Sequence, residues 1–132
     1  MGAWGSRNFE NDSALDFVGA FTTTPSVENL AAALTTVINL GAEGEYIEVE
    51  EASAALAAAE ILATVLGKPA PDFPAELRPA LGAIHNAAAL QQTARKAVNQ
   101  VLKESELQEL WAEGDDFAEW QTIQRDLVDR LK

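Results

Sequence analysis

The feature of the sequence that most limits its fold is a nearly uninterrupted apolar run, EEASAALAAAEILATVLG, at residues 50–67. On a helical wheel, the bulky apolar residues and the alanines of this run together cover well over half of the circumference. Because alanine combines the highest helix propensity with very little bulk, neighbouring helices can approach such a backbone closely. We therefore expect residues 50–67 to form the central, largely buried helix of a helical domain.

One narrow strip of this helix carries its polar groups, and Glu60 is the only charge in its long apolar interior. The strip is made of small and polar residues: Ser53, Ala57, Glu60 and Thr64. It either faces water or meets a polar partner inside the fold. A buried Glu60 would be a candidate general acid. The simpler interpretation is a glutamate at the edge of the core, or one that forms an ion pair with Arg78 or Arg95.

The segment before the central run predicts a first helix over residues 13–22, where apolar residues recur at helical spacing. Three consecutive residues, Asn11, Asp12 and Ser13, can each act as its N-cap. Ser13 and Asp16 also have the spacing of a capping box. The start of this helix is therefore expected within residues 11–13.

A second helix is expected over residues 25–41, with Thr24 as its N-cap and Pro25 at its first position. After residue 67, the run GKPAPDFP breaks regular structure, and further helical patterns follow it. They begin near residues 74, 86, 105 and 116. Together these patterns predict an all-α fold, a compact single domain over residues 1–132 with six or seven helices packed around the Ala-rich helix.

The composition excludes several classes of protein. The chain contains no cysteine, so disulfide scaffolds, thiolate metal sites and cysteine nucleophiles are ruled out. No apolar segment reaches the length needed to span a membrane, and the start of the chain lacks the pattern of a signal peptide. We expect a cytoplasmic protein that does not enter a membrane.

Charge is distributed unevenly along the chain. Residues 1–60 contain ten acids and one base, whereas residues 61–132 contain eleven acids and eight bases, and the formal net charge is -12. Such a surface repels nucleic acid phosphates and anionic membranes, so we expect neither as a partner. It favours a basic protein partner or a cation instead, although a high net charge also serves solubility alone.

Few residues stand out as candidates for a site. The sequence has one histidine, no HExxH or GxSxG spacing and no glycine-rich phosphate loop, so it predicts no catalytic residue, metal site or cofactor. Asp12 and Asp16 are four residues apart, which places both carboxylates on one side of a helix where they can attract a cation. Alternatively, Asp12 caps the helix and Asp16 stabilises its first turn. Glu60 and Trp4 complete the candidate binding residues, with Trp4 either a core anchor or part of a protein interface.

Several strings of the sequence carry a resemblance to a known family. The N-terminal MGAWG and FENDSALDF are the most specific, and EASAALAAAEILA, LRPAL and ELWAE occur in the same order as the rest of the pattern. With Asp115, Asp116 and Trp120 near the end, the chain resembles the bacterial family known as domain of unknown function 4259 over nearly its whole length. The resemblance implies a small bacterial protein in which this whole length is the domain. It implies no reaction.

Two functional hypotheses from different classes follow. The first is a non-enzymatic, acidic helical module that binds another protein, as an immunity-type or regulatory partner of a basic protein. The second is a metal-assisted hydrolase or small-ligand protein that uses Asp12, Asp16 and Glu60, which requires these side chains to converge in the fold. A structural role inside a larger assembly is a third interpretation. The sequence favours the binding module, and it predicts no oligomeric state.

Overall fold

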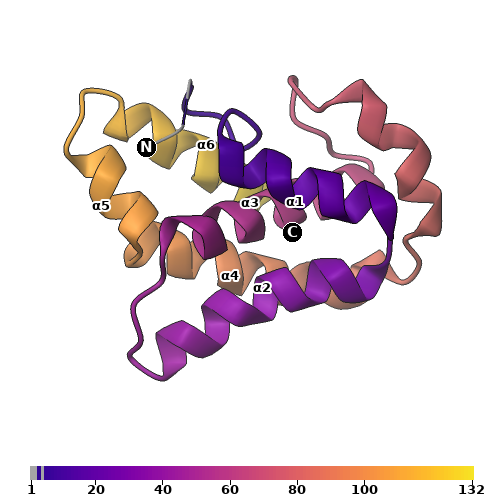
Figure 1. Ribbon diagram of the computed structural model, residues 1–132, viewed down its shortest axis with the longest axis horizontal. Helices are drawn as coiled ribbons and strands as arrows, with labels where there is room; N and C mark the ends of the chain where they lie inside the picture. Colours follow the sequence, from indigo (N-terminus) through magenta and orange to yellow (C-terminus); the bar gives the residue numbers. More distant parts are fainter. Residues whose placement is uncertain (1–2, 4) are drawn as a thin grey trace.

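The computed structural model, which describes residues 3 and 5–132, is organised around α3 (Val49–Val65). All the other α-helices of the described residues pack against this helix (Figure 1). Of its residues from Ala52 to Thr64, all except Ala54 are buried. The prediction of a central, Ala-rich helix is therefore confirmed. Six of its alanines are fully inaccessible to solvent. Their small side chains let the neighbouring helices pack closely against α3.

The all-α fold class is also confirmed. The described part of the chain contains no strand, and its only β-type pairing is an isolated bridge between Ala3 and Asn11. It holds six α-helices and two 3₁₀ helices: α1 (Asp12–Thr23), α2 (Val27–Ala42), α3 (Val49–Val65), η1 (Ala75–Ala83), η2 (Ala87–Leu90), α4 (Gln91–Lys103), α5 (Glu106–Ala112) and α6 (Phe117–Arg130). Among these helices, none is both long and apolar enough to cross a membrane.

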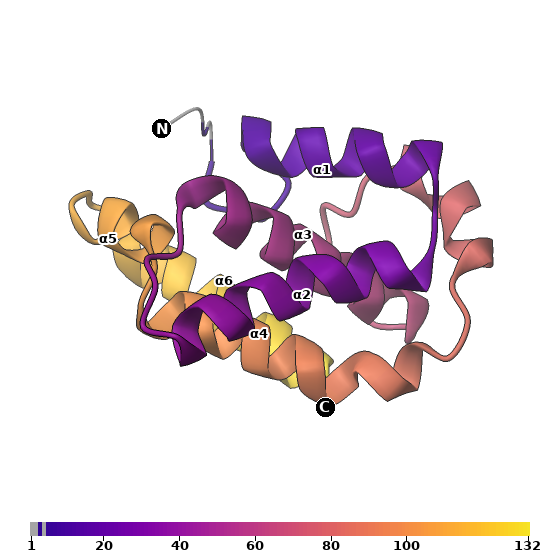
Figure 2. The same cartoon turned by 60° about the horizontal axis from the view of Figure 1, so that its bottom comes forward.

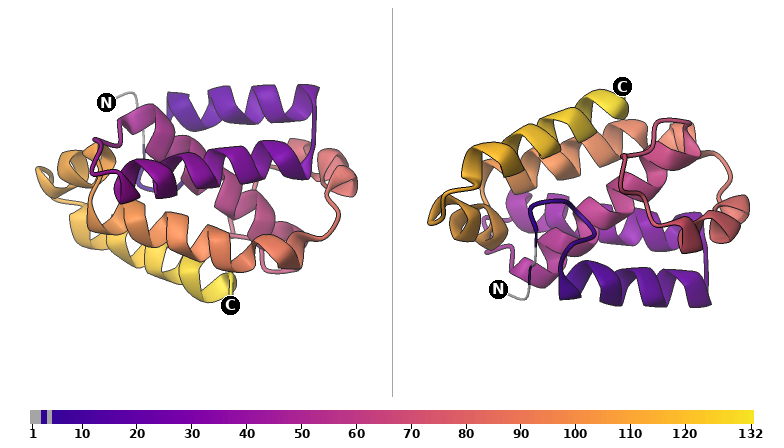
Figure 3. Two further views of the ribbon diagram at one scale, coloured as in Figure 1. Left: turned by 90° about the horizontal axis from the view of Figure 1, so that it is seen from below. Right: turned by 90° about the horizontal axis from the view of Figure 1, so that it is seen from above.

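The helices are arranged in two groups about α3. Helices α1 and α2 run antiparallel on one side, and α4 and α6 lie next to each other on the other side (Figures 2 and 3). Helix α2 packs against both α3 and α4, while α1 packs mainly against α3. Residues 66–90, which include η1 and η2, form the connection between α3 and α4 at one end of the molecule.

Helix α1 begins within the expected range, whereas α2 begins two residues later than predicted. Asn11 is the N-cap of α1, and its side chain accepts a hydrogen bond from the backbone of Ala14, so Ser13 does not cap the helix. Ser26 is the N-cap of α2, and the predicted pair Thr24 and Pro25 lies just before it. In both places several residues of capping type follow one another, and tertiary packing selects among them.

The segment before α1 is fastened to the core by several contacts. Phe9 is buried and meets Phe73 edge-on, with ring centroids 5.7 Å apart. Arg7 approaches Asp72 at 3.7 Å. Asn8 is also buried and forms hydrogen bonds with side chains of α3 and of α6. This N-terminal segment therefore covers one side of α3 and α6.

Candidate functional site

Four buried or nearly buried polar side chains meet on one side of α3 and form what we call the buried polar cluster: Asn8, Glu60, Gln124 and Arg130. They come from the N-terminal segment, the middle of α3, and α6. Glu60 is 2% exposed and Gln124 is completely inaccessible to solvent. The polar strip of α3 therefore meets polar partners inside the fold, which was one of the two outcomes expected from the sequence.

The geometry of the cluster satisfies the glutamate fully. Arg130 donates from its two terminal nitrogens to the two carboxylate oxygens of Glu60, at 2.9 and 3.2 Å. Asn8 donates from Nδ2 to Glu60 Oε2 at 2.8 Å. Asn8 and Gln124 also exchange a reciprocal pair of amide hydrogen bonds of 3.0 and 2.7 Å. Glu60 is therefore neither at the edge of the core nor paired with Arg78 or Arg95, and both forms of the simpler interpretation are wrong.

The chemistry of this cluster is that of a structural ion pair. Burial by itself lowers the pKa of Arg130, but the hydrogen bonds and negative charges of Glu60 and Asp126 outweigh this effect, so the pKa is raised from its ordinary value. The guanidinium consequently stays charged at any physiological pH. Both oxygens of Glu60 accept hydrogen bonds from side chains of the protein, and the carboxylate is 2% exposed, so it is shielded from a substrate in solution.

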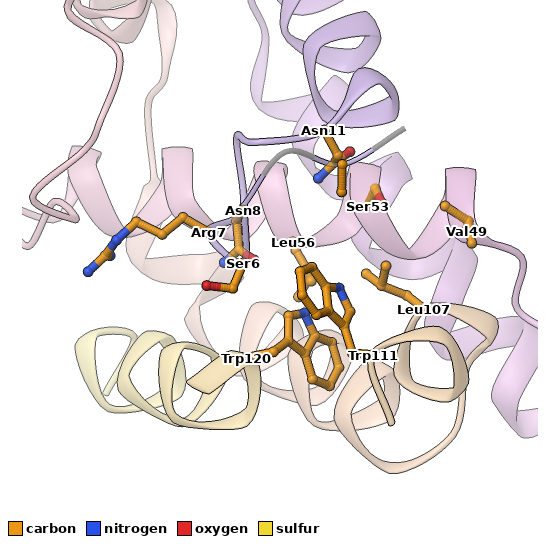
Figure 4. A pocket seen from close by; sticks show the side chains of 11 residues that line it. Ser6, Arg7, Asn8, Asn11, Val49, Ser53, Leu56, Leu107, Trp111 and Trp120 are labelled. Carbon is orange, nitrogen blue, oxygen red and sulfur yellow. The ribbon is translucent and has the colours of Figure 1, made fainter. Parts of the chain in front are cut away.

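A small cavity lies beside the cluster, beneath the N-terminal segment (Figure 4). The indoles of Trp111 and Trp120 lie on one side of it, and Ser53 of α3 with Asn11 lies on the other. Its volume of about 10 Å³ is close to the minimum that holds one water molecule. Ser53 Oγ lines it and is, among the described residues, the one buried side-chain polar atom without a hydrogen-bond partner. This cavity is too small for a metabolite.

The other candidate residues lie elsewhere. Asp12 and Asp16 are exposed on α1, and Asp12 lies in the first turn, where a carboxylate stabilises the positive end of the helix. Within residues 3 and 5–132, no group of three or more acids and histidines is arranged to hold a metal ion. Glu60 is paired in the interior, so it does not join the two aspartates. The fourth candidate, Trp4, lies outside the described residues.

Eight of the ten acidic residues in the first half of the chain lie at the surface between α1 and the first turn of α3. We call them the acidic region: Asp12, Asp16, Glu28, Glu43, Glu45, Glu48, Glu50 and Glu51. The ion pairs of the described residues involve Asp72, Glu60, Asp126 and Asp129, and so include no member of this region. Its carboxylates are therefore available to an external cationic partner.

Three members of the buried polar cluster did not emerge from the sequence. Asn8 and Gln124 are 116 positions apart, and Glu60 and Arg130 are 70 apart. No local spacing connects such residues, since helical patterns relate only neighbours three or four positions away. The one available signal was the isolated charge at Glu60, which requires some buried partner.

Comparisons with known proteins identify the family to which the chain belongs. No curated protein and no solved structure matches the chain. The model of one family, described as Domain of unknown function (DUF4259), matches residues 2–123 of the 132 residues. Since this match covers nearly the whole chain, the protein belongs to the DUF4259 family of domains of unknown function.

Proposed function

We propose that this protein is a non-enzymatic, protein-binding module of the bacterial cytoplasm, which acts as an immunity-type or regulatory partner of a basic protein. The observation that supports the proposal most strongly is the acidic region. Its carboxylates are spread over α1, α2, the loop after α2 and the first turn of α3, and no ion pair among the described residues neutralises them. A field of one sign steers an oppositely charged partner and gives the association its specificity.

The buried polar cluster supports the same proposal indirectly. Its one carboxylate, Glu60, is shielded from solvent and bound by Arg130 and Asn8. A metal-assisted hydrolase or small-ligand protein would need Glu60 to act together with Asp12 and Asp16, which are exposed on α1. The arrangement of these three residues therefore favours the binding module over the alternative.

The experiment that tests the proposal is affinity capture of the tagged protein from a lysate of the cells that produce it. Captured proteins are identified by mass spectrometry after washes at low and moderate salt. We expect an enriched basic partner whose retention falls as salt rises, because ions screen charges on the surface. A partner that is neutral or acidic and is retained equally at both salt concentrations would contradict the proposal, as would the absence of any enriched protein.

Two matched variants show whether the acidic region is responsible. Glu43→Gln with Glu45→Gln removes two exposed charges from the loop after α2. Glu113→Gln with Asp115→Asn removes two exposed charges near the end of α5, outside the acidic region. We expect the first variant to retain clearly less partner than the second. Equal losses would indicate that only the net charge matters.

A further inference from the structure

Helices α1 and α2 are joined by a short turn, yet they leave a groove between them. Two hollows, of about 330 and 240 Å³, lie next to each other along α2, since Ala33 and Thr36 line both of them. We call the two hollows together the α1–α2 groove. Phe17 and Ala20 of α1 line one wall, and α3 closes one end with Glu50 and Ala54.

The small side chains of α2 explain why the groove stays open. Ala32, Ala33 and Thr36 face α1, and none of them is large enough to reach across to it. Helix α1 packs mainly on α3 instead. The rings of Phe17 and Phe21 stack with centroids 6.3 Å apart, and Phe17 remains half-buried at the wall. The groove therefore offers an apolar surface in a position that a further side chain or helix can fill.

Carboxylates surround one part of this apolar surface. Glu50 and Glu51 line the end of the groove at α3. Asp16 is exposed on α1, one helical turn before Ala20, and so lies on the same row of that helix as the groove wall. None of the residues that line the groove is basic, and these three acids take part in none of the ion pairs of the described residues. A complementary occupant must therefore be apolar at its centre and cationic at its edge.

We propose that the α1–α2 groove binds an amphipathic basic helix of a partner protein. The apolar face of that helix packs against Phe17, Ala32 and Thr36, and its lysine or arginine side chains lie next to Glu50 and Asp16. A groove between two antiparallel helices accepts a third helix by the same packing of ridges into grooves that joins helices within a fold. The residues of α2 that line the groove run from Asn29 to Thr36, so an occupant contacts α2 over about two helical turns. This inference rests on the proposed function and identifies the surface and the partner chemistry that would carry it out.

The test uses a fluorescein-labelled peptide of about 18 residues, made of leucine and lysine and arranged so that the leucines form one helical face. A matched peptide has glutamate in place of every lysine. Binding to the full chain is followed by fluorescence anisotropy over a series of salt concentrations. We expect the lysine peptide to bind more weakly as salt rises and the glutamate peptide not to bind. No binding of the lysine peptide to the wild-type protein would overturn the inference.

Two neighbouring threonines provide matched variants that localise the binding. Thr35 and Thr36 are both exposed on α2 and each donates its hydroxyl to a backbone carbonyl one turn earlier, but only Thr36 lines the groove. Thr36→Tyr fills the groove, and we expect it to weaken binding of the lysine peptide by about tenfold or more. Thr35→Tyr should change the affinity by less than about twofold. Equal effects of the two substitutions would overturn the inference.

A charge-reversal pair tests the acidic edge of the groove. Glu50 and Glu119 are both exposed in the first turn of a helix, α3 and α6 respectively, so reversing either charge has a similar effect on helix stability. We expect Glu50→Lys to weaken binding clearly more than Glu119→Lys, and the same loss from both would contradict a site at the groove.

These outcomes are separable from those of the proposed function. If the lysate yields a basic partner that Thr36→Tyr retains fully, the groove is not the binding surface, although the protein is still a binding module. If the lysate yields no partner while the peptide binds in a way that depends on Thr36, the groove is confirmed as a peptide-binding surface and the proposed cellular function fails.

Discussion

Replacing Arg130 with methionine tests the role of the buried polar cluster directly. Methionine keeps much of the volume of the arginine stem but removes the guanidinium that donates to both oxygens of Glu60. Glu60 is 2% exposed, so water cannot replace these hydrogen bonds, and Asn8 is left as its one remaining side-chain donor among the described residues. The variant therefore contains a buried carboxylate without a counter-charge.

Arg130 pairs with two carboxylates, Glu60 and Asp126, and the expected loss of stability is the sum of what these two contacts contribute. Breaking a buried ion pair by removing one partner destabilises a protein by about 3–5 kcal/mol. Proton uptake limits this loss, because protonating a free glutamate with an ordinary pKa of about 4.3 costs about 4 kcal/mol at pH 7. The contact of Arg130 with Asp126 adds little, since Asp126 is 61% exposed and an exposed pair of this kind contributes about 0.5 kcal/mol. We therefore expect Arg130→Met to lower the free energy of unfolding by about 3–4 kcal/mol.

The assay is urea unfolding, followed by tryptophan fluorescence and far-UV circular dichroism. Arg125→Met is the matched control, since Arg125 is exposed on the same helix and forms no ion pair with a described residue; its effect should stay within about 0.5 kcal/mol. The decisive comparison is the double variant with Glu60→Gln, which removes the orphaned charge and should be more stable than Arg130→Met alone. A double variant that is less stable than Arg130→Met would refute the reasoning that the unpaired carboxylate causes the loss.

Three further predictions concern other parts of the molecule. Ser53→Ala removes a buried hydroxyl without a partner and should leave the free energy of unfolding unchanged or raise it. Its control, Ser105→Ala, removes the N-cap of α5 and should lower the free energy of unfolding by about 1 kcal/mol. Equal losses in urea unfolding would show that the Ser53 hydroxyl has a partner. Partial desolvation, the hydrogen bond to Glu109 and nearby carboxylates raise the pKa of Tyr46, the sole tyrosine, so its ultraviolet titration should occur above the ordinary range and move back in Glu109→Gln. Because a raised pKa favours the protonated form in the folded state, any stability from this contact is present below the ordinary tyrosine pKa. It is lost as pH rises through the pKa of Tyr46 in the folded protein. A titration that Glu109→Gln leaves unchanged would show that Glu109 does not raise the pKa of Tyr46. Ala58→Leu adds volume at a completely buried position of α3 and should lower the melting temperature, with a loss of about 1–3 kcal/mol; an unchanged melting temperature would show that α3 is packed less tightly than its burial indicates.

The sequence predicted the helical elements well because their signals are local. The alanine-rich composition of residues 50–67 was enough to identify the buried helix, and the observed α3 (Val49–Val65) differs by one or two residues at its ends. The start of α2 was placed two residues early because Thr24 and Ser26 are both capping residues. In the fold the hydroxyl of Ser26 accepts from Asn29, and the Asn29 side chain donates back to Thr24. Such reciprocal contacts depend on the chain path and not on residue type.

The tertiary partners of polar residues could not be predicted in the same way. The pattern around Glu60 showed that a buried carboxylate needs a counter-charge, but several basic residues could supply it. Only the crossing of α3 and α6 decides that Arg130 does so and that Arg95 binds the Leu131 carbonyl instead. The groove between α1 and α2 could not be predicted from the sequence either. Alanines that pack closely against a neighbouring helix and alanines that line an opening have the same sequence pattern.

The contacts of Glu60 also determine when the protein can complete its folding during synthesis. Its partner Arg130 follows it by 70 positions, and Asn8 binds a residue 116 positions later. Until α6 has left the ribosome, Glu60 lacks the counter-charge of Arg130, and Asn8 can bind Glu60 but not Gln124. Helices α1 to α5 can form and collapse earlier, and Phe9 can already contact Phe73. The hydrogen bonds that Gln124 and Arg130 make with the N-terminal segment and with α3 come only with α6. A fragment that ends before α6 therefore lacks the counter-charge of Glu60 and one of the two partners of Asn8.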